Sequence, residues 1–179
     1  KPGAVVIVTS TLSPAYCQAL AIEAARGGID VLDCPVSGAR PRAEQGTLAL
    51  ICGGEPGVIE RCRAVMEAMG DIHHCGPVGM GQVAKLVNQG MLYSILKLIQ
   101  EGRAMARAYG MEADTLMGVL GQSMGNTTAG ENWDMFAANW SHIKKLGQKD
   151  IDLCITAARA NQAAIPLIEA RRDMSWEMP

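Results

Sequence analysis

The chain changes its hydrophobic pattern once, close to residues 76–79. Before this point, short apolar runs rich in β-branched residues alternate with helical segments, an order typical of a parallel α/β layer. After it no strand-like run returns, and the periodicity indicates helices alone. We therefore expect two parts, an α/β part at 1–78 followed by an all-α part at 79–179.

The α/β part is expected to contain four strands and two helices. The first helix has clear start signals, since Ser13 suits an N-cap and Pro14 the first helical position. Residues 37–46 lack periodicity and carry glycine, proline and charge, so we expect a surface loop there. The strands are predicted at 4–8, 29–34, 47–52 and 72–75, and the helices at 14–26 and 56–69.

The all-α part begins with a long helix from Gly81 almost to Gly110, apolar on most faces, as expected of a helix buried on several sides. Its apolar surface is more than a two-domain monomer of this size easily covers, which favours a homodimer or homotetramer. Further helices are predicted at 112–122, 129–138, 144–163 and 165–172.

Composition excludes several classes of protein. With a net charge of −2, a pI near 5.9 and scattered basic residues, the chain lacks the positive patch that nucleic acid requires. No apolar run approaches the roughly 20 residues that span a bilayer, and the start does not resemble a signal peptide, so we expect a cytoplasmic protein that does not bind membranes.

The cysteines and histidines favour neither disulfides nor a metal. The six cysteines show no paired C-x-x-C spacing, so they are interpreted as reduced and mostly buried. The run His73-His74-Cys75 contains metal-ligating residue types, but neighbours on an extended segment point to opposite faces. We therefore expect no metal site.

Two motifs carry the chemistry. In Asp33–Ala39, the turn at Ser37-Gly38 offers backbone N–H groups and a hydroxyl to a carboxylate. In Gly79–Asn88, Lys85 and Asn88 lie three residues apart and project together from one helix. Together they make a plausible site for a hydroxy acid.

Each of these residues also has an ordinary structural interpretation. Ser37-Gly38 could be a simple turn after a strand, and Lys85 could extend its amine to solvent. A lysine in a partly dry cleft would instead favour the neutral amine, which can exchange protons. Asn88 and Gln89 share the face of Lys85 and could hold a substrate or serve as interhelical hydrogen-bond partners.

The segment Gly79–Ala84 also matches the dinucleotide fingerprint G-x-G-x-x-G/A, with Glu101 twenty residues beyond Gly81. That fingerprint requires a second strand before the acidic residue, whereas here the helix continues through Glu101. We favour the interpretation that these glycines let the helix begin close against the sheet, and keep the nucleotide site as the alternative.

The chain resembles the β-hydroxyacid dehydrogenases, a family related to 6-phosphogluconate dehydrogenase. The resemblance covers nearly the whole chain, and its motifs occur in the family's order and spacing. They are Thr9–Pro14, Asp33–Ala39, Gly46–Leu48, Gly53-Gly54, Gly76–Asn88 and Lys149-Asp150.

The resemblance implies a partial Rossmann-type parallel sheet layer followed by a helical catalytic and dimer-forming domain. It implies hydride transfer between NAD or NADP and a small hydroxy acid, with Lys85 as the general acid and base. The substrate would be bound by Ser37, Gly38, Asn88 and Gln89, and the cofactor contacted by Thr11 and Lys149.

Three departures from the family accompany the resemblance. Ala39 stands where the family usually has glycine, and Gln89 where many members have asparagine. The glycine-rich nucleotide-binding half that opens family members is not seen before Lys1, so we expect a partial chain that binds a dinucleotide poorly on its own. The alternative function is a non-catalytic member that serves as a binding or assembly module.

Overall fold

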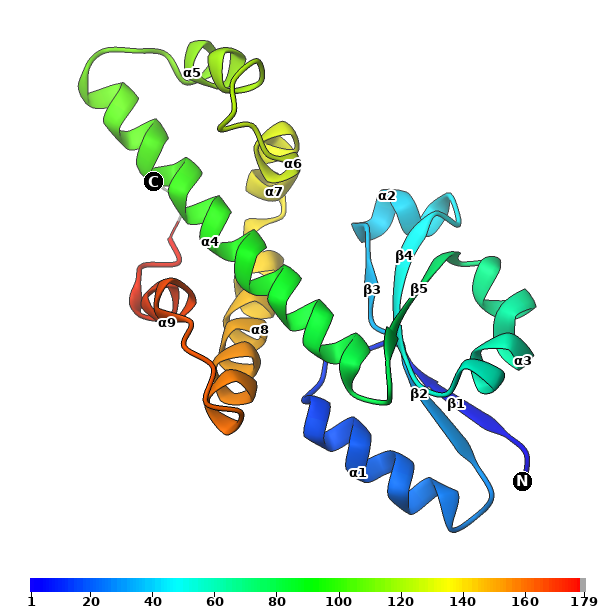
Figure 1. Cartoon of the computed structure of the whole chain (residues 1–179). Helices are drawn as coiled ribbons and strands as arrows, with labels where there is room; N and C mark the ends of the chain where they lie inside the picture. The colour runs from blue at the N-terminus through cyan, green and yellow to red at the C-terminus, as the bar shows by residue number, and fades with distance from the viewer. Residues whose placement is uncertain (178–179) are drawn as a thin grey trace. The chain divides into compact units, whose positions relative to one another are not determined.

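The computed structural model describes residues 1–177, which form two compact units. The sheet unit comprises Lys1–Asn88 with Thr156–Gln162, and the helical unit comprises Gln89–Ile155 with the residues from Ala163 onward. Figure 1 shows the elements of both units.

The sheet unit contains the predicted alternation of strands and helices. Every strand and helix expected in residues 1–78 is present, with ends that differ by a few residues from the predicted ones. The elements are β1 Val5–Val8, α1 Pro14–Ala25, β2 Asp30–Asp33, β3 Val36–Ser37, α2 Ala39–Glu44, β4 Leu48–Gly53, α3 Pro56–Glu67 and β5 Gly70–Gly76.

The expected surface loop at 37–46 is wrong, because these residues contain a helix, α2. This helix has no buried residue, so it shows no apolar periodicity by which it could have been predicted. Instead, the helix contains an ion pair between residues one turn apart, in which Arg40 Nε lies 2.7 Å from Glu44 Oε1. In Figure 1, α2 connects the ends of β3 and β4.

The sheet is mixed rather than parallel throughout. β1 pairs with β2 and β4 with β5 in parallel, as predicted, but β4 runs antiparallel to both β2 and β3. A parallel return needs a crossover of about a dozen residues or more, and the link that carries α2 is too short for one. β4 therefore comes back beside β3 in the opposite direction.

Apolar side chains from strands and helices form the core of the sheet unit. α1 contacts β2, and α3 contacts β5. The core residues are Leu32, Cys34, Leu50, Cys52, Ile59 and Met66. All six cysteines of the chain are unbonded and four are buried, which confirms the prediction of reduced, mostly buried thiols.

The helical unit is built on α4 (Met80–Ala108), which starts in the sheet unit. The predicted helix at 129–138 is two short helices, because the backbone of Asn132 leaves the helical region between them. The other helices follow the prediction. The elements are α5 Ala113–Leu120, α6 Thr128–Glu131, α7 Trp133–Ala138, α8 Trp140–Ala160 and α9 Pro166–Asp173.

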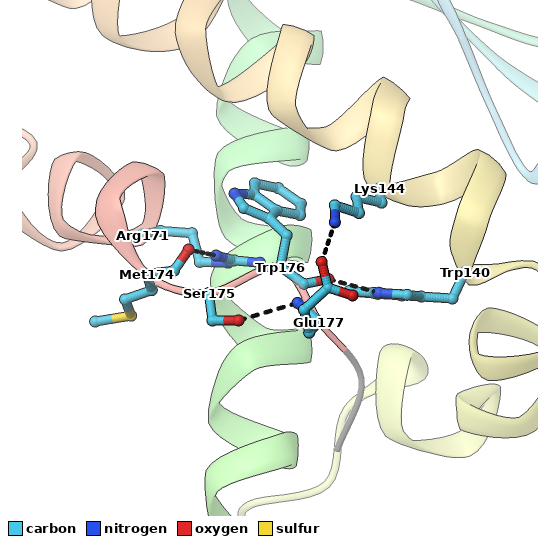
Figure 2. A network of polar contacts seen from close by, with 7 residues as sticks. All are labelled: Trp140, Lys144, Arg171, Met174, Ser175, Trp176 and Glu177. Atoms are coloured by element: carbon cyan, nitrogen blue, oxygen red, sulfur yellow. Dashed lines mark hydrogen bonds and ion pairs between the residues drawn. The ribbon is translucent and has the colours of Figure 1, made fainter.

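The segment after α9 is fixed to the helical unit through Trp176. The indole N–H of Trp140 donates to the backbone oxygen of Trp176 at 2.7 Å, and the guanidinium of Arg171 stacks 3.7 Å from the Trp176 ring centre. Lys144 forms an ion pair with Glu177 (Figure 2). These contacts hold the last described residues against α8 and α9.

A glycine in α8 makes room for the Trp176 ring. A Cβ at Gly147 would lie 2.5 Å from Trp176 and 2.7 Å from Tyr93, whose ring lies 5.6 Å from that of Trp176.

Within residues 1–177, no helix combines the length and the apolar character needed to cross a membrane. The core residues of the unit are Tyr93, Leu96, Ala129, Trp133, Ile151, Ile155 and Trp176.

Candidate active site

The carboxylate of Asp33, at the end of β2, caps the start of α4. Its Oδ1 accepts a hydrogen bond from the Gly79 N–H at 2.6 Å, and its Oδ2 accepts one from the Gln82 N–H at 2.7 Å. The first N–H groups of a helix have no partner within the helix, and the helix dipole favours a negative charge there. Asp33 thus fixes the first turn of α4 to the carboxyl end of β2.

Burial sets the ionisation of this cap. The side chain of Asp33 is completely buried, and this loss of solvent raises the pKa of its carboxyl group above the ordinary value. The hydrogen bonds from the Gly79 and Gln82 amides act in the opposite direction, but they do not cancel the effect of burial.

Gly81 lets the first turn of α4 approach the sheet backbone. A Cβ at this position would lie 2.4 Å from the Ile51 oxygen and 2.8 Å from the Gly53 nitrogen. This confirms the interpretation of the glycines as a close helix entry. The alternative of a nucleotide site at Gly79–Ala84 loses support, because the protein's own carboxylate occupies two of the amides that would hold a phosphate.

The side chain of Gln82 joins α4 to the segment after β1. Its Oε1 accepts a hydrogen bond from the Leu12 N–H at 2.9 Å, and its Nε2 donates to the Ser10 oxygen at 2.9 Å. Thr11 lies between these two anchored residues. Gln82 and Asp33 stand in the motifs noted in the sequence but received no role there, because periodicity does not tell a buried polar side chain from an exposed one.

Three segments distant in sequence therefore meet at one turn of helix. They are the segment around Thr11, the motif that begins at Asp33, and the motif that contains Lys85. Lys85 follows Gln82 by three residues on the same helix and is buried, with 7% of its surface exposed. Asn88, a turn further along, is exposed.

The Ser37-Gly38 turn has an unusual backbone. Ser37 ends β3, where it pairs with Ala49 of β4, and Gly38 has a φ of 132°. Ala39 has a φ of 55°, in the left-handed region that favours glycine. Glycine is required at position 38 for two reasons. Its φ of 132° is one that other residues rarely adopt, and a Cβ there would lie 2.6 Å from the Arg42 side chain.

The two remaining predicted site residues, Gln89 and Lys149, belong to the helical unit. Both contact Asp150, a buried carboxylate: Gln89 Nε2 donates to Oδ2 at 2.6 Å, and Lys149 Nζ lies 3.1 Å from Oδ1. Burial, followed by the charge of Asp150, raises the pKa of the nearby Tyr93 hydroxyl above its ordinary range. The substrate and cofactor contacts of Gln89 and Lys149 stay predictions.

One of the two adjacent histidines, His74, has backbone partners. His74 Nε2 lies 2.9 Å from the Gly54 oxygen and 3.0 Å from the Gly76 oxygen. Across residues 1–177, no group of three or more potential ligand side chains is placed to hold a metal ion.

The carboxyl ends of β1 and β2 are the candidate place for a cofactor in the sheet unit. In α/β sheets, ligands bind beyond the carboxyl ends of parallel strands. β1 and β2 are parallel, and the residues after their carboxyl ends are the Thr11 segment and the Asp33 motif. The position and polarity of Thr11 therefore fit a contact with a nicotinamide cofactor.

Comparison with known families agrees with this arrangement. Residues 1–81 match the model of the NAD-binding domain of 6-phosphogluconate dehydrogenase. Residues 79–178 match the NAD-binding domain of NADP-dependent 3-hydroxyisobutyrate dehydrogenase. The chain belongs to the β-hydroxyacid dehydrogenase family.

Individual relatives agree with the family. The NAD-dependent L-serine dehydrogenase of Pseudomonas aeruginosa is 32% identical over 178 residues, which cover 93% of this chain and 60% of that protein. The 3-hydroxyisobutyrate dehydrogenase of the same organism is 33% identical over 92% of this chain and 59% of its own. The chain thus spans about three fifths of the length of these relatives.

A solved structure shows the same fold. The 3-hydroxyisobutyrate dehydrogenase of Mycobacterium tuberculosis, in a structure with L-serine, superposes with a TM-score of 0.85 at 29% identity. The match covers 97% of this chain and 64% of that one. An α/β layer followed by a helical part is therefore the architecture of the family.

Proposed function

We propose that the protein containing this chain transfers hydride between NAD or NADP and a small 3-hydroxy or 2-hydroxy carboxylic acid. The relatives support the reaction, since they are named as dehydrogenases of L-serine, 3-hydroxyisobutyrate and 2-(hydroxymethyl)glutarate. All three compounds carry a hydroxyl and a carboxylate, the two groups that the predicted site is suited to bind.

One observation carries the proposal, namely the hydrogen bond from the Gln82 N–H to the Asp33 carboxylate at 2.7 Å. It joins the motif that contains the Ser37-Gly38 turn to the motif that contains Lys85. The two motifs lie in one unit and are anchored at a common point. That is the arrangement expected if they serve the same substrate.

In the proposed reaction, a bound nicotinamide would be the hydride acceptor. The amine of Lys85 takes the hydroxyl proton as the carbinol carbon is oxidised, and returns it in the reverse direction. The hydroxyl and backbone N–H groups at Ser37 and Gly38 bind the carboxylate. Asn88 orients the substrate together with Gln89.

The cofactor is proposed to contact Thr11 and Lys149. Residues 1–78 would be the C-terminal part of a nucleotide-binding domain, and residues 79–179 the helical catalytic and dimer-forming domain. We place the protein in the cytoplasm. The residue and domain assignments rest on the family and on the residue types present at the matching positions.

Lys85→Ala tests the chemistry in the complete gene product that contains these residues. With L-serine, 3-hydroxyisobutyrate and 2-(hydroxymethyl)glutarate as substrates, kcat/KM is expected to fall by roughly 10²-fold to 10⁴-fold, the usual contribution of a general acid or base. Lys97→Ala on the same helix is the matched control and should retain turnover. If Lys85→Ala retained the same turnover as Lys97→Ala, Lys85 would have no role in the mechanism.

The rival function, a non-catalytic binding or assembly module, gives a different result. Such a protein would bind NADH or NADPH, or a partner, and show no hydride transfer with any of the three acids and either cofactor. Measurement of NADH absorbance across this panel therefore separates the two functions.

A homodimer or homotetramer is also part of the proposal. One face of α4 in the helical unit exposes Met91, Leu98 and Met105, which recur every seven residues and are 56%, 65% and 67% exposed. The expectation that α4 is buried on several sides is wrong for this face. A second copy of the chain would cover such a stripe, because a seven-residue apolar repeat suits helix–helix packing.

A further inference from the structure

Gln82 has a buried side chain whose two polar atoms are both used. It is completely buried, and two of its side-chain hydrogen bonds reach the backbone of one short segment, at Ser10 and Leu12. A buried amide is costly unless it is paired, so the two bonds account for its presence in this packed position. Their geometry also suits glutamine specifically.

A primary amide is uncharged and offers an acceptor and a donor on two separate atoms at the same end. Oε1 meets the N–H of Leu12 while Nε2 meets the carbonyl of Ser10, so the segment is held from both sides of Thr11. A hydrophobic residue would leave both backbone groups unpaired. A lysine or carboxylate would satisfy one of them and place a charge near Asp33.

The surroundings keep this contact neutral. Cys17 of α1 is completely buried, and burial together with the charge of Asp33 raises the pKa of its thiol to about 11. A hydrogen bond with the Gln82 side chain lowers this pKa but does not cancel the rise, so the thiol stays protonated at neutral pH.

We propose that Gln82 is a positioning residue that holds the cofactor-contacting segment at Thr11 in register with the helix that carries Lys85. Hydride transfer requires the cofactor to meet the carbinol carbon while the proton acceptor meets the hydroxyl on that carbon, and small displacements of such groups reduce rates strongly. Gln82 supplies that alignment from a position three residues before Lys85. The inference rests on the proposed function and assigns a role to a residue that touches neither substrate nor cofactor.

The first test measures the contact itself, without activity. Gln82→Met preserves the size of the side chain and removes both hydrogen bonds. In the 179-residue chain, amide hydrogen exchange of Leu12 is expected to become at least about tenfold faster, since its N–H loses its acceptor. The amide of Cys34, which donates to the Val8 oxygen, serves as the internal reference for opening of the whole unit.

The second test measures catalysis in the complete gene product. Gln82→Met should raise the KM for the dinucleotide and lower kcat, each by about tenfold or more, while the KM for the hydroxy acid changes little. A role in folding alone would reduce the amount of active protein and leave both KM values unchanged. Gln18→Met is the matched control, because Gln18 also donates to a backbone oxygen, that of Val78, but from an exposed position.

Gln82→Glu provides a second variant if the methionine variant does not fold. A protonated glutamic acid can both accept from Leu12 and donate to Ser10, whereas the carboxylate cannot donate. The dinucleotide KM of this variant, relative to wild type at the same pH, is therefore expected to rise with pH. A ratio independent of pH would overturn the proposal.

The outcomes separate this inference from the proposed function. Unchanged Leu12 exchange in a folded Gln82→Met protein, or an unchanged dinucleotide KM, would overturn the role of Gln82. Faster Leu12 exchange in a protein that transfers no hydride to any hydroxy acid would leave the contact standing and overturn both the proposed function and the alignment role built on it.

Discussion

The backbone of Gly81 touches that of Ile51 so closely that a single methyl group cannot be inserted, since a Cβ would lie 2.4 Å from the Ile51 oxygen. The atoms in the way belong to the backbones of β4 and β2, which cannot move as a flexible side chain could. This approach places the first turn of α4, about one turn before Lys85, directly against the sheet. A glycine at this position is therefore a structural requirement.

Gly81→Ala is expected to lower the free energy of unfolding by about 3 kcal/mol or more, because overpacking against backbone forces the helix away from the sheet. Urea denaturation measures this change in the free energy of unfolding. Gly102→Ala, further along α4, is the control: a methyl group there would meet no atom of another element within 4 Å, and the variant should gain about 0.5–1 kcal/mol from helix propensity. Equal stabilities would contradict the close approach.

Asp33→Asn tests the helix cap through its pH dependence. Because burial raises the pKa of Asp33, the folded state binds a proton more tightly than the unfolded state, whose aspartate has a pKa of about 3.9. Protonation of Asp33 stabilises the folded wild type fully below about pH 3.9. This stabilisation is lost as the pH rises through the raised pKa. The stability difference between wild type and Asp33→Asn should therefore shrink as pH rises.

Urea titrations of both proteins between pH 4 and 7, a range set by the ordinary aspartate pKa of about 3.9, measure this difference. At neutral pH the variant should still be less stable by about 1–3 kcal/mol, since its amide cannot accept from both Gly79 and Gln82. A difference that grows with pH would mean that the pKa is lowered in the folded protein.

Much of the fold followed from local signals, and the exceptions have physical causes. Pro14 and the β-branched run before Thr9 marked α1 and β1, because capping and strand patterns act over a few residues. The reversed direction of β4 depends on the length of a link that was taken for a loop. Hydrogen bonds such as Asp33 to Gln82 join residues 49 apart in sequence, which no periodicity reveals.

Ala39→Gly is expected to stabilise the protein by about 1 kcal/mol. Ala39 has a φ of 55°, which costs an L-residue roughly 1–2 kcal/mol and costs glycine almost nothing. Thermal and urea unfolding measure the gain. Ala43→Gly, an exposed position of the same helix, should instead lose about 0.5–1 kcal/mol, and a loss at both positions would contradict the strain at Ala39.

Trp176→Ala is expected to destabilise the helical unit by about 3–5 kcal/mol, as for other large aromatic residues truncated in a core. Trp176 is 6% exposed and packs against Tyr93 and Arg171. Its neighbour Met174, 40% exposed, is the control, and Met174→Ala should change stability by about 0.5 kcal/mol or less. Similar effects at both positions would show that the segment after α9 is not anchored through the indole.

Leu98→Glu tests the apolar stripe on α4. Leu98 is 65% exposed, so the charge should cost the folded monomer little, yet a carboxylate buried between two copies would be strongly unfavourable. Sedimentation equilibrium should show an assembled wild type and a dissociated variant. Leu167→Glu on α9, 82% exposed and outside the stripe, should remain assembled. A monomeric wild type, or dissociation by Leu167→Glu alone, would place the self-association surface elsewhere or remove it.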